Sequence, residues 1–190
     1  MKNLNFFFDS TFNQREQLPR KFTVKFDPVK ASVKLRTRVL VDGVQVGDLL
    51  DDNSKENDGY RFHDVFHYTF AAILGWSPCI RSMMKRKRKS APHIDEIEDG
   101  ARATITEEAI SLLVFNKARQ NQFFTNKEKI SGQLLTIIKE MTAPFEVNVR
   151  SKKDWREAIF IGYSLFCNLL ANDGGTIHFD MINRTALYEK

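Results

Sequence analysis

Hydrophobic and polar residues alternate along the first quarter of the chain. Residues 21–26 place phenylalanine or valine at every second position, with lysine or threonine between them, and residues 32–41 repeat this alternation. Asp42-Gly43 then separates this run from residues 44–46, and Asp-Gly between alternating runs is typical of a β-hairpin turn. Because a period of two directs neighbouring side chains to opposite faces, we expect a small antiparallel sheet with one buried face and one solvated, basic face.

From residue 60 onward the apolar positions recur at spacings of three and four, as they do on the buried face of a helix. The first such stripe covers residues 60–74 and ends at Gly75. Ser77-Pro78 is a helix cap followed by a proline at the first helical position, which predicts a short helix through residue 84. The remaining predicted elements are helices over 95–120 (despite Gly100), 128–141 and 153–172, and a last short strand over 176–180. The helix over 153–172 is the most apolar, and we expect it to be central.

These elements together predict a mainly α protein, a helical bundle with a small N-terminal antiparallel β-hairpin or sheet. A chain of 190 residues can bury one substantial core, so we expect a single domain over residues 1–190. Within it, a β-rich segment (1–50) packs on a helical core (58–172), and residues 173–190 form a C-terminal strand and tail.

The overall composition indicates a soluble globular protein. With 42% hydrophobic and 28% charged residues the chain resembles ordinary soluble globular proteins. Cys79 and Cys167 lie far apart in apolar settings, which favours reduced core thiols and a cytoplasmic location. The longest apolar segment, residues 158–171, is shorter than the roughly 20 residues that cross a bilayer, so we expect no membrane association.

A net charge of +5 fits an anionic partner, and much of the excess lies in one run of five basic residues. Three interpretations of this run remain open: a solvated loop, a clamp for the phosphates of a nucleotide substrate, or a contact with a nucleic-acid backbone. For the second interpretation the candidate substrate-binding residues are Lys85, Arg86, Lys87, Arg88 and Lys89.

Two histidines, His63 and His67, are four residues apart and therefore share one helix face. Such a pair can bind a transition metal, although the zinc-protease motif His-Glu-x-x-His is absent. The alternatives are structural histidines bonded to neighbouring acids, or histidines that contact a substrate phosphate or a catalytic water.

Carboxylates follow at two positions on the helix predicted over 95–120. Glu96 and Asp99 form one acidic pair, and Glu107 and Glu108 form another roughly 16 Å further along an unbroken helix. One of the two pairs is expected to bind a cation together with Asp64 of the preceding helix. Glu107 and Glu108 lie among apolar neighbours, so at least one of them is buried and needs a partner.

The His63-Asp64 pair resembles the central motif of HD-type phosphohydrolases, but that family has a further upstream histidine and His63 is the first in this chain. A broader resemblance is to MazG-like proteins, specifically to the domain that follows the pyrophosphohydrolase domain in some of them. It is carried by Gly59-Tyr-Arg-Phe-His-Asp-Val-Phe-His67, Leu74-Gly-Trp-Ser-Pro78, Lys85-Arg-Lys-Arg-Lys-Ser90, Asp95-Glu-Ile-Glu-Asp-Gly100 and Glu107-Glu108.

The resemblance implies hydrolysis of nucleoside triphosphates to monophosphate and pyrophosphate, in an enzyme type that is often dimeric. MazG-type enzymes hold Mg²⁺ between Glu-x-x-Glu on one helix and Glu-x-x-Asp on the next. Glu96-x-x-Asp99 matches the second half, whereas the first half is absent.

We therefore expect Mg²⁺, with Mn²⁺ as the alternative, at four carboxylates: Asp64, Glu96, Asp99 and Glu107. His67 and Glu108 are the predicted catalytic residues, and His63 joins the basic run in binding substrate. The alternative is a non-catalytic module of a MazG-like or defence system that binds nucleotide or nucleic acid.

Overall fold

The computed structural model describes residues 6–29, 35–121, 123 and 130–190, which form six strands and six α-helices. The strands are β1 (Lys21–Val29), β2 (Arg36–Val41), β3 (Val44–Gln45), β4 (Leu50–Asp51), β5 (Gly175–Asp180) and β6 (Thr185–Glu189). The helices are α1 (Asp64–Leu74), α2 (Pro78–Met83), α3 (Pro92–Ile97), α4 (Ala101–Gln120), α5 (Gly132–Met141) and α6 (Lys152–Asn172). Short 3₁₀ helices cover Gln14–Glu16, Tyr60–Phe62 and Glu146–Val149.

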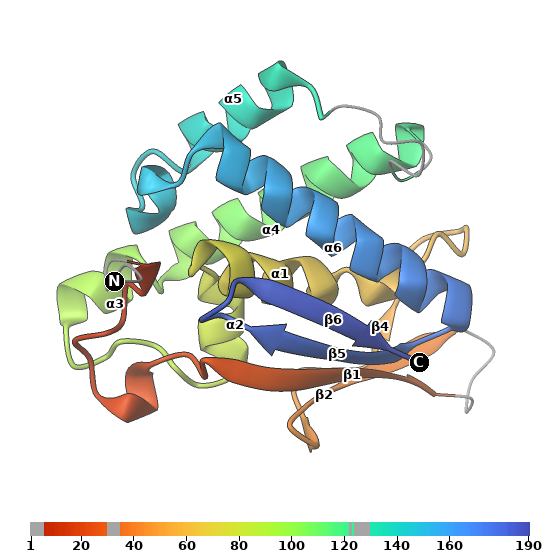
Figure 1. Cartoon of the computed structure of the whole chain (residues 1–190), viewed down its shortest axis with the longest axis horizontal. Coiled ribbons are helices and arrows are strands. Elements are labelled where there is room, and N and C mark those ends of the chain that lie inside the picture. Colours follow the sequence, from red (N-terminus) through yellow and green to blue (C-terminus); the bar gives the residue numbers. More distant parts are fainter. Residues whose placement is uncertain (1–5, 30–34, 122, 124–129) are drawn as a thin grey trace.

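The strands form one antiparallel sheet in the order β3-β2-β1-β5-β6, with β4 paired to β2. β1 lies between β2 and β5, with Phe22 opposite Phe179 and Phe26 opposite Gly175. Figure 1 shows the helices on one side of this sheet, with α1 and α6 next to it and α4 and α5 further away. The two ends of the chain therefore build the same sheet.

The prediction of a mainly α bundle with an N-terminal hairpin is corrected in one respect: the protein is helix-rich but mixed α/β. The sequence predicts β5 as a last short strand, without naming the strand that it pairs with, and it does not predict β6. β5 pairs with β1, about 150 residues away in sequence, and β6 pairs with β5. A pairing between segments so far apart has no local sequence signal. Of the predicted elements, residues 32–34 and 128–129 lie outside the described residues.

α1, not α6, is the central helix. All eleven residues of α1 are buried, because the helix contacts β5 and β6 on one side and α2, α4 and α6 on others. α6 alternates buried and exposed positions and carries a capping box formed by Ser151 and Asp154 at its start. None of the described helices is long and apolar enough to cross a membrane.

The helix predicted over 95–120 is two helices, α3 and α4, which meet at Gly100. Gly100 caps α4 in an extended conformation (φ −85°, ψ −177°). A Cβ atom there would lie only 2.0 Å from the backbone oxygen of Glu96, so the close approach of the two segments requires glycine. The break changes the direction of the chain between the two predicted acidic pairs.

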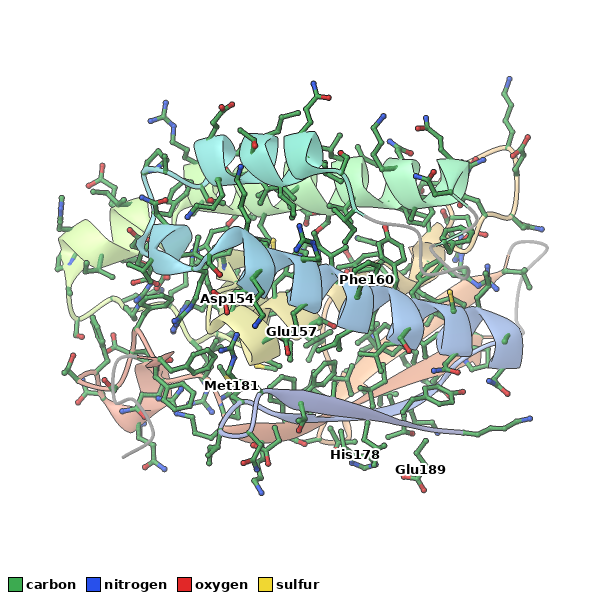
Figure 2. The ribbon with its side chains drawn as sticks, turned by 45° about the horizontal axis from the view of Figure 1, so that its top comes forward. Asp154, Glu157, Phe160, His178, Met181 and Glu189 are labelled. Carbon is green, nitrogen blue, oxygen red and sulfur yellow. The ribbon has the colours of Figure 1, made fainter. Side chains whose placement is uncertain are left out.

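The outer face of the sheet is polar, as the alternation predicts. Figure 2 shows His178 and Glu189 on this side, and their Nε2 and Oε2 atoms are 2.8 Å apart. The basic character of the face is reduced by carboxylates, since Lys21 pairs with Asp180 and Arg38 pairs with Asp27.

Candidate functional site

A cluster of polar side chains lies where α1, α2 and α4 meet inside the protein. The turn before α1 contributes His63, α1 itself contributes His67, and the middle of α4 contributes Glu107 and Glu108. A histidine four residues after another returns to the same helix face, which directs both rings toward α4. We call these four residues the histidine cluster.

Glu107 is fully buried and accepts three hydrogen bonds. His67 Nδ1 lies 2.9 Å from its Oε1 atom, Ser77 Oγ donates to the same oxygen at 2.7 Å, and the backbone N–H of Cys79 donates to Oε2 at 2.9 Å. Ser77 is also the N-cap of α2 and accepts from the backbone of Ile80. These bonds therefore fix the orientation of the Glu107 carboxylate, which in turn fixes the orientation of the His67 ring.

The bond to Glu107 decides which nitrogen of His67 carries hydrogen. An ionised carboxylate only accepts, so Nδ1 must donate, and in the neutral ring Nε2 has a free lone pair. Nε2 is buried without a hydrogen-bond partner among the described residues, and it lies 3.4 Å from Oε2 of Glu108. A buried lone pair therefore faces a carboxylate oxygen, an arrangement that requires a proton or a metal cation between the two atoms.

His63 has the same arrangement. Its Nδ1 lies 2.9 Å from the backbone oxygen of Tyr60, so Nδ1 donates and Nε2 is left with the lone pair. Nε2 is 3.3 Å from Oδ1 of Asp64. The Tyr60 ring stacks on the imidazole with 4.2 Å between centroids, which fixes the plane of the ring.

Three of these side chains can reach a common metal ion. His63, His67 and Glu108 can each place one ligand atom within 4.8 Å of the other two. The exposed fraction of the side chain rises from 1% in His67 to 14% in His63 and 47% in Glu108, so the set opens to solvent on one side. Three protein ligands with an open side are typical of catalytic metal sites, whereas structural zinc sites are closed.

A second set of ligands, His67, Cys79 and Glu107, also satisfies the distance criterion but is entirely buried. Its carboxylate is already occupied by three donors. Burial also raises the pKa of the Cys79 thiol, which disfavours the thiolate that metals bind. The first set is therefore the better candidate.

The carboxylates of the cluster favour a positive charge between them, either a proton on His67 or a metal cation. The nearby imidazole of His67 lowers the pKa of Glu108 to about 2. Burial lowers the pKa of His63, so this ring is neutral and can act as a ligand at pH 7. Burial disfavours the charged form of His67, but the Glu107 and Cys79 side chains together outweigh this effect and raise the pKa of His67 well above its ordinary value. A metal at this site would therefore compete with a proton on His67.

The four carboxylates predicted as Mg²⁺ ligands lie in separate surroundings. Asp64 lies beside His63, and Glu107 is bonded to His67, Ser77 and Cys79, whereas Glu96 is exposed on α3. Asp99 is fully buried and accepts from the backbone N–H and from Nε and Nη2 of Arg88. Its oxygens are therefore occupied by an arginine.

The basic run is divided between different environments. Arg88 is 1% exposed and pairs with Asp99 and Glu146, so it is part of the interior. Lys85 and Lys89 are exposed, Lys87 is half-buried, and Arg86 donates to the backbone oxygen of Gln14. The run is neither a uniformly solvated loop nor a single clamp.

Tyr60, Ser77 and Cys79 were missed as contributors to the site. The sequence does predict Ser77-Pro78 as the start of a helix, and the first backbone N–H groups of a helix need acceptors from outside it. This is the one sequence signal that could have indicated a buried carboxylate next to Ser77. Nothing in the sequence connects Tyr60 or Cys79 to α4.

A family model described as the MazG C-terminal domain matches residues 3–190. Neither the curated proteins nor the solved structures contain a significant match to the chain.

Proposed function

Because the chain belongs to the family of MazG C-terminal domains, we propose that it is a metal-dependent nucleotide hydrolase. Its reaction splits nucleoside triphosphates into monophosphate and pyrophosphate, and its divalent metal is held by His63, His67 and Glu108. The observation that carries the proposal is the buried Nε2 atom of His67, which faces Glu108 without a hydrogen-bond partner among the described residues.

The arrangement around both histidines supports a metal. In metal sites, a ligating histidine usually donates its second ring N–H to a carboxylate or a backbone carbonyl, which fixes the tautomer and the ring orientation. His67 does so to Glu107 and His63 does so to the Tyr60 carbonyl. Nε2 of His63 is thereby held as an acceptor, and Nε2 of His67 becomes one when the ring gives up its second proton, which is the form that binds metal.

The types of ligand atom at the site indicate which metals it can bind. Mg²⁺ prefers oxygen ligands, whereas imidazole nitrogens combined with a carboxylate suit transition metals. Of the two ions predicted from the sequence, Mn²⁺ fits His63, His67 and Glu108 better than Mg²⁺, and Zn²⁺ fits as well. A divalent metal here would supply charge that polarises a phosphoryl oxygen.

Asp64 is the residue we assign as proton acceptor. Its side chain is 9% exposed and lies 3.3 Å from His63, at the edge of the proposed ligand set. In the proposed reaction the oxygen of a water molecule forms a bond to the α-phosphorus. The bond from that phosphorus to the bridging oxygen breaks, pyrophosphate leaves, and the proton from water passes to Asp64.

The test is pyrophosphate release from a panel of ribo- and deoxyribonucleoside triphosphates, with Mn²⁺, Zn²⁺, Mg²⁺ and EDTA arms. Glu108→Gln should abolish both release and Mn²⁺ binding, because it removes the one charged ligand. Glu157→Gln is the matched control, since Glu157 is exposed on α6 (Figure 2), a helix that contributes no residue to the cluster.

Metal binding that is equal in both variants would overturn the metal site. Metal binding that Glu108→Gln abolishes, without release from any triphosphate, would overturn the hydrolase and favour a metal-containing binding module.

A further inference from the structure

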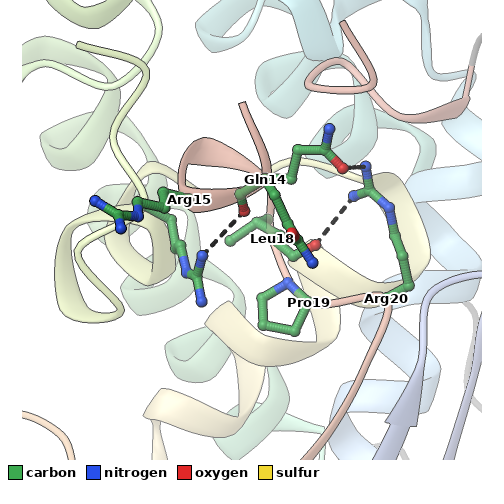
Figure 3. Close-up of a pocket in the computed structure, with 7 residues that line it drawn as sticks. Gln14, Arg15, Leu18, Pro19 and Arg20 are labelled. Carbon is green, nitrogen blue, oxygen red and sulfur yellow. Dashed lines mark hydrogen bonds between the residues drawn. The ribbon is translucent and has the colours of Figure 1, made fainter. Parts of the chain in front are cut away.

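A second candidate binding site lies on the surface, formed by the N-terminal segment and the loop after α2. It is a hollow of about 340 Å³. Figure 3 shows Arg15 and Arg20 on either side of Leu18 and Pro19. The residues that line it are Gln14, Arg15, Gln17, Leu18, Pro19, Arg20 and Arg86.

We propose that this hollow binds the phosphate groups of a small polyphosphate anion, either free pyrophosphate or the tail of a nucleotide. The lining contains three arginines and no carboxylate. Arginine carries its charge at all physiological pH values, and its planar guanidinium matches the oxygens of a phosphate.

The acids nearest to the hollow are already occupied. Glu16 accepts from the backbone N–H and hydroxyl of Ser90 at 2.7 and 2.6 Å. Asp9 is buried and accepts from Arg20, from Arg81 and from the backbone N–H of Leu18. Neither carboxylate forms an ion pair with the remaining two arginines of the lining.

Arg15 and Arg86 consequently lack an ion-pair partner among the described residues. Arg15 is exposed, and Arg86 is half-buried and uses Nη1 to donate to the Gln14 backbone oxygen at 3.0 Å. The other guanidinium N–H groups of Arg86 have no protein acceptor among the described residues. Two uncompensated cations beside one hollow raise the local concentration of anions.

The wall of the hollow is also held in place before any ligand binds. Arg20 donates to Asp9, to the Leu18 backbone oxygen and to Gln17 Oε1, so its guanidinium has a fixed position. Arg81 Nη1 donates to the backbone oxygen of Glu16 at 2.9 Å, which attaches the N-terminal segment to α2. A site fixed in this way loses less conformational entropy when a ligand binds.

This hollow is separate from the metal centre. Ser77 and Cys79, at the start of α2, contact Glu107, whereas Arg86 follows the other end of that helix. The proposed anion site therefore does not depend on the proposed hydrolytic function, and it can be tested with metal absent.

The experiment is calorimetric titration of pyrophosphate and ATP into the full chain in EDTA, at low and high salt. Arg15→Gln is the decisive variant, because Arg15 is exposed without an ion-pair partner and its loss leaves the fold intact. We expect Arg15→Gln combined with Arg86→Gln to weaken binding at least about tenfold, which corresponds to the loss of one charge-assisted hydrogen bond or more. Arg15→Gln alone should show part of this loss with an unchanged melting temperature.

Lys89→Gln is the matched control, since Lys89 is an exposed cation of the same basic run that does not line the hollow. The proposal is overturned if the wild type binds neither anion, or if Lys89→Gln and Arg15→Gln weaken binding equally. It is also overturned if a single-stranded oligonucleotide binds and pyrophosphate and ATP do not.

Discussion

Two clusters of ionisable residues contact α2, and they differ in how completely their polar atoms are paired. The histidine cluster leaves Nε2 of His67 without a hydrogen-bond partner among the described residues. The other, which we call the arginine cluster, pairs every charged group with at least one opposite charge. It consists of Asp9, Arg81, Arg88, Asp99 and Glu146.

Arg88 shows how complete the pairing of the arginine cluster is. Its Nε and Nη2 atoms donate to Asp99 at 3.1 and 2.7 Å, and Nη1 and Nη2 donate to Glu146 at 2.9 and 2.8 Å. These bonds join the loop after α2 to the segment between α3 and α4 and to the 3₁₀ helix before α6. Buried ions that are fully paired with each other have no free atom left to bind a ligand. The unpaired Nε2 atom of the histidine cluster can still bind one.

The comparison predicts that loss of a carboxylate lowers stability in the arginine cluster and lowers ligand affinity in the histidine cluster. Asp99→Ala leaves Arg88 and Arg81 buried with one partner fewer, and should lower the free energy of unfolding by about 3–5 kcal/mol. Urea denaturation measures this effect. Glu96→Ala, three residues earlier and exposed, is the control and should change stability by less than about 0.5 kcal/mol. An Asp99→Ala protein as stable as the wild type would remove the distinction between the clusters.

In the histidine cluster the corresponding change should affect ligand binding more than folding. Glu107→Gln keeps the shape of the side chain but weakens its hold on the His67 ring, and we expect about 10–100-fold lower Mn²⁺ affinity. Competition with a chromogenic chelator gives the affinity, and Glu157→Gln serves again as the control. Unchanged affinity would mean that Glu107 does not orient a metal ligand.

At the edge of the arginine cluster, Glu98 should make the stability of the protein depend on pH. Burial raises the pKa of Glu98 to about 7 from an ordinary value of 4.5, and its carboxyl accepts from the backbone N–H of Glu146. The folded protein therefore holds a proton that the unfolded chain releases, so this group lowers stability as the pH rises from about 4.5 to 7.

Glu98→Gln removes this titration, and should reduce the loss of unfolding free energy between pH 4.5 and 8 by about 2 kcal/mol relative to the wild type. Thermal melts at several pH values measure it, with Glu96→Gln as the control. A variant that follows the wild-type pH profile would show that Glu98 is ionised in the folded protein at neutral pH.

Local patterns in the sequence predict single elements of the structure, whereas contacts between distant segments cannot be predicted from them. The alternation over residues 21–26 and the apolar stripe over 60–74 predicted β1 and α1, because both patterns depend only on neighbours along the chain. Helical spacing also indicated that His63 and His67 share a face. It could not indicate that Arg88 lies opposite Asp99, or that β1 lies beside β5, because such pairings are decided when distant segments pack.

The smallest expected effect concerns Cys79, and it decides between the two possible ligand sets. Its sulfur is 3.7 Å from Oε1 of Glu108 and 3.8 Å from the Thr104 backbone oxygen, distances at which a thiol bonds weakly. If the metal is bound by His63, His67 and Glu108, Cys79→Ser should change Mn²⁺ affinity by less than about 1 kcal/mol. The Co²⁺-loaded protein should then lack the near-ultraviolet charge-transfer band of a cobalt–thiolate bond. A band that Cys79→Ser abolishes would instead place the ion in the closed set with Glu107, where it would stabilise the fold and be shielded from substrate.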